Sequence, residues 1–220
     1  MQHLTLDTPA GLIGAWRADP VIPPKGGIVV VQEVFGVNRH IRALVERFAA
    51  HGFVAVAPAL FDVFGPRIEL DYDQDGVQRG LALVQDLGFE RALEMVNAAA
   101  GALSESVGKT GVVGYCWGGS VALLANTRLG LPAVGYYGGR SMGFLHERQR
   151  APLMLHFGEH DPIIPPADVE AHREAFPEAQ VFVYDAGHGF NCEERKDYDE
   201  SAAQLALQRT LRFFEQALHP

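Results

Sequence analysis

The strongest constraint on this chain is the segment GYCWGG at residues 114–119. A short apolar run precedes it, and small and aliphatic residues typical of a helix follow it at 120–126. A strand, a tight G-x-C-x-G turn and a helix form a nucleophile elbow, here with cysteine where serine is usual. The flanking glycines let the strained turn pass close to the helix. The pattern predicts that Cys116 is presented at a strand end, with the backbone N–H of Trp117 free to stabilise an oxyanion.

The alternative is a buried, inert cysteine between chance glycines, so the rest of the chain has to decide. A length of 220 residues suits one domain, 1–220, with a large core. A net charge of −9 disfavours nucleic-acid and acidic-membrane partners, and we see no targeting segment or membrane span. Two cysteines match no disulfide framework or zinc motif. We therefore expect a cytoplasmic monomer without a metal or cofactor.

Apolar runs alternate with amphipathic segments, which predicts an α/β fold with a mainly parallel sheet and helices on both faces. An N-terminal hairpin is expected at 4–6 and 12–17, and an excursion around 58–88 is expected to cover the site. The remaining strands are predicted at 27–32, 53–57, 110–115, 133–137, 153–157 and 181–184. Helices are predicted within 38–52, 89–103, 120–126 and 203–218.

Polar side chains follow four of the predicted strands, where ligands bind in sheets of this kind. Cys116, Asp161 and His188 each follow one strand, and Glu33 follows the strand at 27–32. The chain order of nucleophile, acid and histidine is that of α/β-hydrolases. In this interpretation His188 takes the thiol proton and later activates water, while Asp161 fixes its tautomer and stabilises the imidazolium. Asp185 is a rival acid, but it lies only three residues before His188.

These residues give the chain a resemblance to the dienelactone hydrolases (carboxymethylenebutenolidases and their relatives) of the α/β-hydrolase superfamily. The resemblance runs from the N-terminal hairpin to the final helix. It rests on five motifs: QEVFGVN at 32–38, GYCWGG at 114–119, GYYG at 135–138, GEHD at 158–161 and GHGFN at 187–191. The first two are specific when they occur together, and the other three are commoner among hydrolases.

The resemblance implies a triad of Cys116, His188 and Asp161, with an oxyanion hole from the backbone N–H groups of Trp117 and Val34. It implies hydrolysis of a small-molecule ester or lactone, which can be anionic, through an acyl-enzyme. It also implies that Glu33 sits against the resting thiol and helps convert it to thiolate once substrate binds. A carboxylate there disfavours a free thiolate in the empty site, which limits oxidation.

The sequence departs from the family where a substrate carboxylate is expected to bind. The resemblance places an arginine one helical turn past the histidine, where this chain has Cys192. Arg79, and less favourably Arg67, could supply the anion contact instead. Cys192 itself is either a filler residue or a partner of Cys116 in a regulatory disulfide. The candidate substrate contacts are therefore Arg79, Tyr137, Phe35 and Phe190.

Two other hypotheses remain beside the hydrolase. A catalytically weak α/β-hydrolase fold could serve as a small-molecule binding module, or the two cysteines could form a thiol redox sensor. His156, His160 and Asp161 could be read as metal ligands, but alternate strand positions point to opposite faces and no further ligand pair completes a site.

Overall fold

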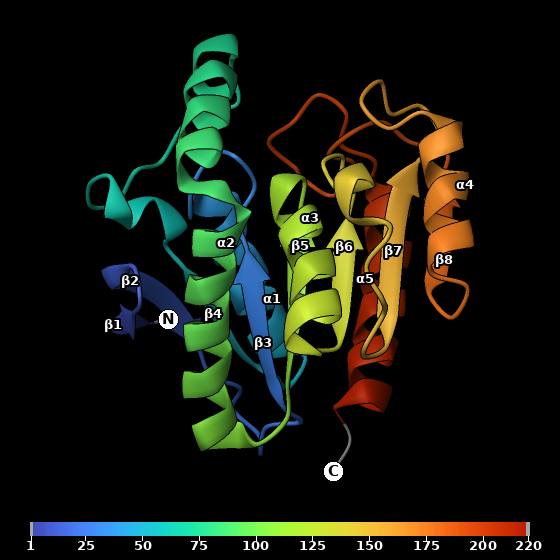
Figure 1. Cartoon of the computed structure of the whole chain (residues 1–220). Helices are drawn as coiled ribbons and strands as arrows, with labels where there is room; N and C mark the ends of the chain where they lie inside the picture. Colours follow the sequence, from blue (N-terminus) through green and yellow to red (C-terminus); the bar gives the residue numbers. More distant parts are fainter. Residues whose placement is uncertain (1, 219–220) are drawn as a thin grey trace.

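An eight-stranded sheet in the order β1-β2-β4-β3-β5-β6-β7-β8 forms the centre of the molecule (Figure 1). Strands β3 to β8 run parallel, and β2 pairs antiparallel with both β1 and β4. The structure is a computed structural model, and it describes residues 2–218. The strands are β1 (Gln2–Thr8), β2 (Gly11–Ala18), β3 (Gly27–Val31), β4 (Val54–Pro58), β5 (Thr110–Tyr115), β6 (Ala133–Tyr136), β7 (Leu153–Gly158) and β8 (Gln180–Tyr184).

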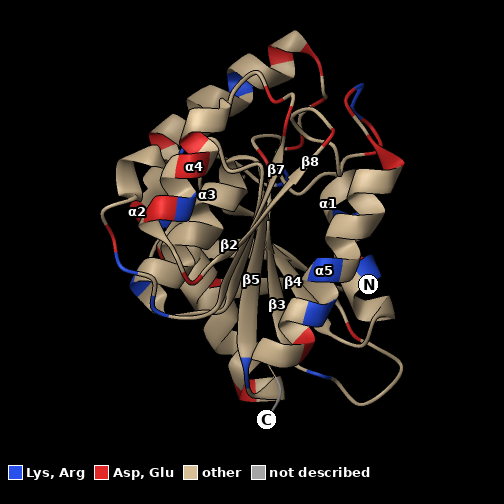
Figure 2. Cartoon of the chain, turned by 90° about the vertical axis from the view of Figure 1, so that its right-hand side faces the viewer, with Lys and Arg blue, Asp and Glu red and all other residues tan. Residues whose placement is uncertain are grey.

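Helices cover both faces of this sheet. Figures 1 and 2 show α2, α3 and α4 on one face and α1 and α5 on the other. The helices are α1 (Arg39–Ala50), α2 (Gln74–Val107), α3 (Trp117–Leu124), α4 (Pro166–Ala175) and α5 (Glu200–Ala217), with short helical turns η1 (Leu60–Val63), η2 (Ala125–Leu129) and η3 (Met142–Phe144). The predicted α/β fold with an N-terminal hairpin is confirmed.

The parallel strands form an apolar core. Strands β3 to β8 contain no Lys, Arg, Asp or Glu, and Figure 2 shows these residues on the surrounding helices and loops. Every residue of β3, β4, β5, β6 and β7 is buried. Such two-sided burial explains the continuous β-branched runs of the sequence. The carboxyl ends of these strands all meet at one edge of the sheet, where the predicted site residues lie.

Two helical segments differ from the sequence prediction. Helix α4 was not predicted, because its sequence has only two buried positions, Val169 and His172, and so shows no apolar stripe. Helix α2 begins at Gln74, inside the predicted irregular excursion, and continues past a non-helical Gly88 with φ +72°. Glycine adopts this left-handed conformation without a Cβ penalty, so one long helix can bend there.

A side-chain cap begins the first helix of the chain. The Asn38 side chain accepts a hydrogen bond of 3.2 Å from the backbone N–H of Ile41, which satisfies a free donor at the start of α1. Helix α1 therefore begins directly after the loop that follows β3, and the capped helix start holds the far end of that loop in place. No helix within residues 2–218 combines the length and apolar character needed to cross a bilayer.

Candidate active site

The elbow holds Cys116 in a strained conformation between β5 and α3. Its φ is +54° and its ψ is −120°, a backbone conformation that residues other than glycine rarely adopt. Close backbone contacts explain the flanking glycines: a Cβ at Gly114 would lie 1.8 Å from the carbonyl oxygen of Gly118. A Cβ at Gly118 would lie 2.4 Å from the carbonyl oxygen of Gln32. The elbow is thus locked against both its own helix and the end of β3.

The predicted triad residues come together in the structure. His188 Nε2 lies 3.3 Å from Cys116 Sγ, and His188 Nδ1 lies 2.7 Å from Asp161 Oδ2. The other carboxylate oxygen of Asp161 accepts backbone N–H bonds from Ile163 at 2.8 Å and Ile164 at 3.2 Å. Asp161 and His188 are both buried. The carboxylate is thus fixed so that it can hold the imidazole facing the thiol.

The environment of His188 favours its protonated form. Burial alone lowers the pKa of this imidazole, but the hydrogen bonds with Asp161 and Cys116 and the negative charges of these two groups raise the pKa to about 10. A raised pKa makes the imidazole a stronger base toward the neighbouring thiol.

The two predicted oxyanion donors lie on segments that meet at the elbow. Trp117 is the first residue of α3, so its backbone N–H lies at the helix N-terminus. Its indole ring stacks on Phe89 of α2, with ring centroids 5.8 Å apart, so this side chain serves packing. Val34 follows β3 and is held by α2, because a Cβ at Gly80 would lie 2.1 Å from the Val34 carbonyl oxygen. The backbone of Val34 is therefore fixed by direct contact.

Glu33 is buried, but its hydrogen bonds run to groups that the sequence analysis did not name. The Tyr72 hydroxyl donates to Oε2 at 2.9 Å, and Arg195 Nη1 donates to Oε1 at 3.3 Å. The carboxylate thus bonds with these two side chains rather than with the Cys116 thiol, which differs from the expected contact. Both oxygens are bound, and the arginine balances the buried charge.

An open cavity of about 750 Å³ lies beside this ion pair. Phe35 is one of its lining residues, as predicted for a substrate contact, and Tyr72 and Arg195 line it as well. The start of α2 and the loop at 194–197 provide the other walls, namely Asp73, Gln74, Val77, Gln78, Glu194, Lys196 and Asp197. The cavity thus contains an aromatic wall and a cation next to Glu33. The predicted triad residues are not among its lining residues, so the Arg195–Glu33 pair connects it to the site.

Three other candidate contacts have different surroundings. Arg79 is exposed and lies 3.7 Å from Asp75 on the same helix, and it does not line the cavity. Phe190 has no exposed surface and packs on Tyr137 and Tyr184, so it belongs to the core. Tyr137 is also buried, with φ +38°, and its ring centroid lies 5.1 Å from that of His188. Of these three residues, only Tyr137 contacts the triad.

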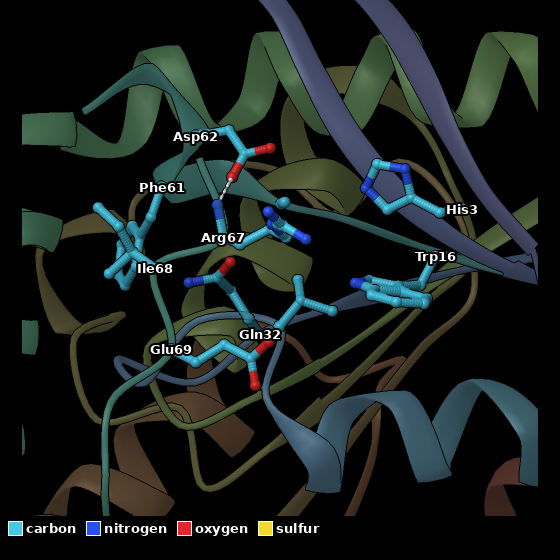
Figure 3. A pocket seen from close by; sticks show the side chains of 10 residues that line it. His3, Trp16, Gln32, Phe61, Asp62, Arg67, Ile68 and Glu69 are labelled. Carbon is cyan, nitrogen blue, oxygen red and sulfur yellow. Dashed lines mark hydrogen bonds between the residues drawn. The ribbon is translucent and has the colours of Figure 1, made fainter. Parts of the chain in front are cut away.

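Arg67 lies in a different pocket. Figure 3 shows it with His3, Trp16 and Asp62 around a space of about 10 Å³, room for roughly one water molecule. Its backbone N–H donates to Asp62 at 2.8 Å. Gln32 also lines this pocket, although it directly precedes Glu33 in the chain. Neither a triad residue nor a hydrogen-bond partner of the Glu33 carboxylate lines this space, so its position does not support an anion contact for Arg67.

Sequence reasoning missed Arg195 because it assumed helical spacing after His188. The segment from 188 to 198 consists of turns, in which the Arg195 N–H donates to the Cys192 carbonyl at 3.0 Å. The arginine therefore reaches the site from seven residues past the histidine rather than four. The presence of glycine and asparagine at 189 and 191 was the available signal for a turn.

His156 and His160, two of the possible metal ligands in the sequence, have other partners. His156 bonds through Nδ1 to the Tyr184 hydroxyl at 2.8 Å and through Nε2 to Thr210 at 3.1 Å. His160 is exposed and pairs with Asp185 at 2.6 Å. Asp185 therefore faces His160, whereas Asp161 bonds with His188, which favours Asp161 as the triad acid.

Comparisons with known proteins agree with this architecture. A model of the dienelactone hydrolase family matches residues 13–218. The carboxymethylenebutenolidase of Pseudomonas putida is 35% identical over 215 residues, covering 91% of this chain and 89% of that protein. A solved structure of a Klebsiella pneumoniae protein, assigned to the dienelactone hydrolases, has a TM-score of 0.87 and 28% identity over 98% of both chains. The chain therefore belongs to the dienelactone hydrolase family and is an ester hydrolase with the α/β-hydrolase fold.

Proposed function

We propose that this enzyme hydrolyses a small ester or lactone that carries a carboxylate, with Cys116 as the nucleophile. The observation that carries the proposal is the continuous hydrogen-bonded path from Cys116 Sγ through His188 to Asp161, with distances of 3.3 and 2.7 Å. A nucleophile, a base and a group that orients the base are the parts that acyl transfer needs.

In the acylation step His188 Nε2 takes the thiol proton while Cys116 Sγ attacks the carbonyl carbon. The oxyanion that forms accepts hydrogen bonds from the backbone N–H groups of Trp117 and Val34. The tetrahedral intermediate then collapses to a thioester on Cys116, and His188 returns the proton to the departing oxygen. In a lactone that oxygen stays attached to the acyl group, so nothing leaves the site at this stage.

In the deacylation step water replaces the departed oxygen. His188 takes a proton from this water, and the hydroxide attacks the thioester carbonyl. The same two N–H groups stabilise the second oxyanion, and the Cys116 sulfur leaves as thiolate and recovers its proton from His188. Asp161 stays ionised throughout and stabilises the imidazolium.

Glu33 and Arg195 give this chemistry a way to respond to substrate. Arg195 lines the cavity, with 19% of its side chain exposed, and it pairs with the buried Glu33. A substrate carboxylate that draws the guanidinium away frees one oxygen of Glu33. The freed carboxylate can then accept the thiol proton when His188 is already protonated; His188 then gives its own proton to the departing oxygen, and Glu33 returns its proton to the sulfur after deacylation. In this account the substrate is anionic and Arg195 recognises it.

Replacing Arg195 with glutamine is expected to raise KM for a carboxylate-bearing ester by about 10- to 100-fold, because a charge-assisted hydrogen bond contributes about 1.5–3 kcal/mol. KM for a neutral ester of similar size should change much less. Steady-state kinetics with both esters measure the difference. Arg79→Gln is the matched control, since Arg79 is exposed outside the cavity, and equal effects of the two variants would contradict the assignment.

Mass spectrometry of the intact protein tests the nucleophile. The wild type is mixed briefly with a panel of enol lactones and activated esters, beside Cys116→Ala and Cys192→Ser. We expect a transient acyl adduct on the wild type and on Cys192→Ser, and none on Cys116→Ala. An adduct that disappears only in Cys192→Ser would transfer the role to the other thiol. Binding without any adduct or turnover would instead support a small-molecule binding module.

A further inference from the structure

A second cluster of reactive side chains includes Glu33, the acidic partner of Arg195. It consists of Glu33 at the end of β3, His40 in the first turn of α1 and Cys192 in the loop before α5. One ligand atom from each residue lies within 4.8 Å of the other two. Their exposed fractions are 0%, 3% and 0%, so the cluster is closed off from bulk water. Three distant segments of the chain thus bring a carboxylate, an imidazole and a thiol together.

One member of this cluster has an unmet hydrogen-bonding need. His40 Nε2 is buried and has no hydrogen-bond partner. Buried polar atoms are nearly always paired, and an unpaired one in a native protein calls for an explanation such as a bound ion. An unpartnered, buried imidazole beside a thiol and a carboxylate has the properties of a metal ligand.

We propose that Glu33, His40 and Cys192 form a binding site for a divalent transition-metal ion of the Zn²⁺ or Co²⁺ type. Imidazole, thiolate and carboxylate are the donors found in zinc sites, and thiolate excludes the hard ions Mg²⁺ and Ca²⁺. On binding, a bond forms between the metal and Cys192 Sγ, and the thiol proton passes to solvent. Glu33 and neutral His40 each donate a lone pair without losing a proton. The two negative ligands balance the charge of the ion.

A cation at this point favours the charged sulfur, because metal coordination deprotonates a thiol. A metal bound by Glu33 competes with Arg195 for the same carboxylate. If the proposed role of Glu33 in hydrolysis holds, the metal-bound enzyme is inhibited, but the site itself does not depend on that role.

Two other groups of ligands must be distinguished from this site. Glu159, His160 and Asp185 form an exposed group of possible ligands without sulfur. Cys116 and His188 offer a thiol and an imidazole at the catalytic centre. The chain has only two cysteines, so the Cys116→Ser variant retains a single thiol, Cys192. Any thiolate-to-metal absorption band in that variant must come from the proposed site.

Titration of the full-length protein with Co²⁺ under reducing conditions tests the proposal. We expect the wild type and Cys116→Ser to show a thiolate-to-cobalt charge-transfer band that saturates at one equivalent. His40→Gln in the Cys116→Ser background should weaken binding by at least about 100-fold, since even outer partners of metal ligands are worth 10- to 100-fold. His160→Gln in the same background is the control and should bind cobalt unchanged.

The Cys116→Ser protein decides the outcome without any change to the proposed ligands. Absence of the band in that variant would overturn the proposal, and so would a band that His40→Gln leaves unchanged. Circular dichroism of each variant confirms that the fold is retained. Zn²⁺ added to the cobalt-loaded protein should remove the band by displacement, which provides an independent check that both ions share the site.

Discussion

Replacing Asp161 with asparagine is expected to lower kcat for an activated ester by about 10⁴-fold, the loss typical when the acid of a triad becomes an amide. The amide oxygen can still accept the backbone N–H bonds of Ile163 and Ile164, so the fold should remain. The amide NH₂ then faces His188 Nδ1 and forces that nitrogen to accept. The ring proton moves to Nε2, where it opposes the Cys116 thiol instead of accepting its proton. Steady-state kinetics measure the loss.

Asp185→Asn is the matched control for this variant. Asp185 lies only three residues before His188, but its carboxylate is exposed and bonds with His160. The control should retain nearly full activity. A loss of less than about tenfold in Asp161→Asn, or a larger loss in Asp185→Asn, would contradict the assigned triad, given the size of the effect expected for the triad acid.

The loss of unfolding free energy in Asp161→Asn, relative to the wild type, should be larger at low pH than at high pH. Burial lowers the pKa of His188, and the Asp161 and Cys116 contacts raise it to about 10 from a normal value of 6.5. A folded pKa above the unfolded one means that the protonated imidazole stabilises the fold below pH 6.5, and that this contribution is lost as pH rises through about 10. In urea unfolding, the free energy of unfolding of Asp161→Asn should therefore fall further below that of the wild type at pH values under 6.5 than at pH values above 10.

Replacing Gly118 with alanine is expected to lower the unfolding free energy by about 3 kcal/mol, near the upper end for overpacking a close contact. The new Cβ would lie 2.4 Å from the Gln32 carbonyl oxygen and 2.6 Å from that of Val31, so the end of β3 must move. This movement also shifts the loop that carries Val34. We expect kcat to fall by about 10²- to 10³-fold, as when one oxyanion donor is lost.

Gly101→Ala provides the control for this substitution. Gly101 lies in α2, and a Cβ there meets nothing within 4 Å. Alanine should stabilise this helix position by about 0.5–1 kcal/mol and leave kcat unchanged. Thermal unfolding followed by circular dichroism compares the two variants. A Gly118→Ala protein as stable and active as the wild type would show that the elbow tolerates movement.

The sequence was sufficient to predict the elbow, most of the sheet and the proximity of the three residues proposed as the triad. Cys116, Asp161 and His188 each follow a strongly apolar strand, and strand ends in a parallel sheet meet at one edge whatever the loops between them do. The glycines around Cys116 carried the same information, because only a close approach of backbones requires them. Local pattern and global position agreed at these residues.

The partners of Glu33 could not be predicted in the same way. Arg195 reaches Glu33 through irregular turns, and Tyr72 does so from the segment before α2. Neither segment has a period from which a direction could be derived. His40 shows the same limit, because no sequence pattern links it to Glu33 or Cys192, which lie on other segments of the chain. Contacts between loops depend on tertiary structure, whereas contacts at strand ends follow from the order of elements.

The order of the elements has a consequence for how the enzyme is made. Cys116 lies near the middle of the chain, whereas Asp161 and His188 follow β7 and β8, the last two strands. A ribosome synthesises Cys116, the proposed nucleophile, well before His188, its proposed base, and β8 joins the edge of the sheet only after Gln180–Tyr184 have emerged. In the proposed mechanism the thiol meets its activating imidazole only after β8 has joined the sheet, so hydrolysis begins only with the completed fold.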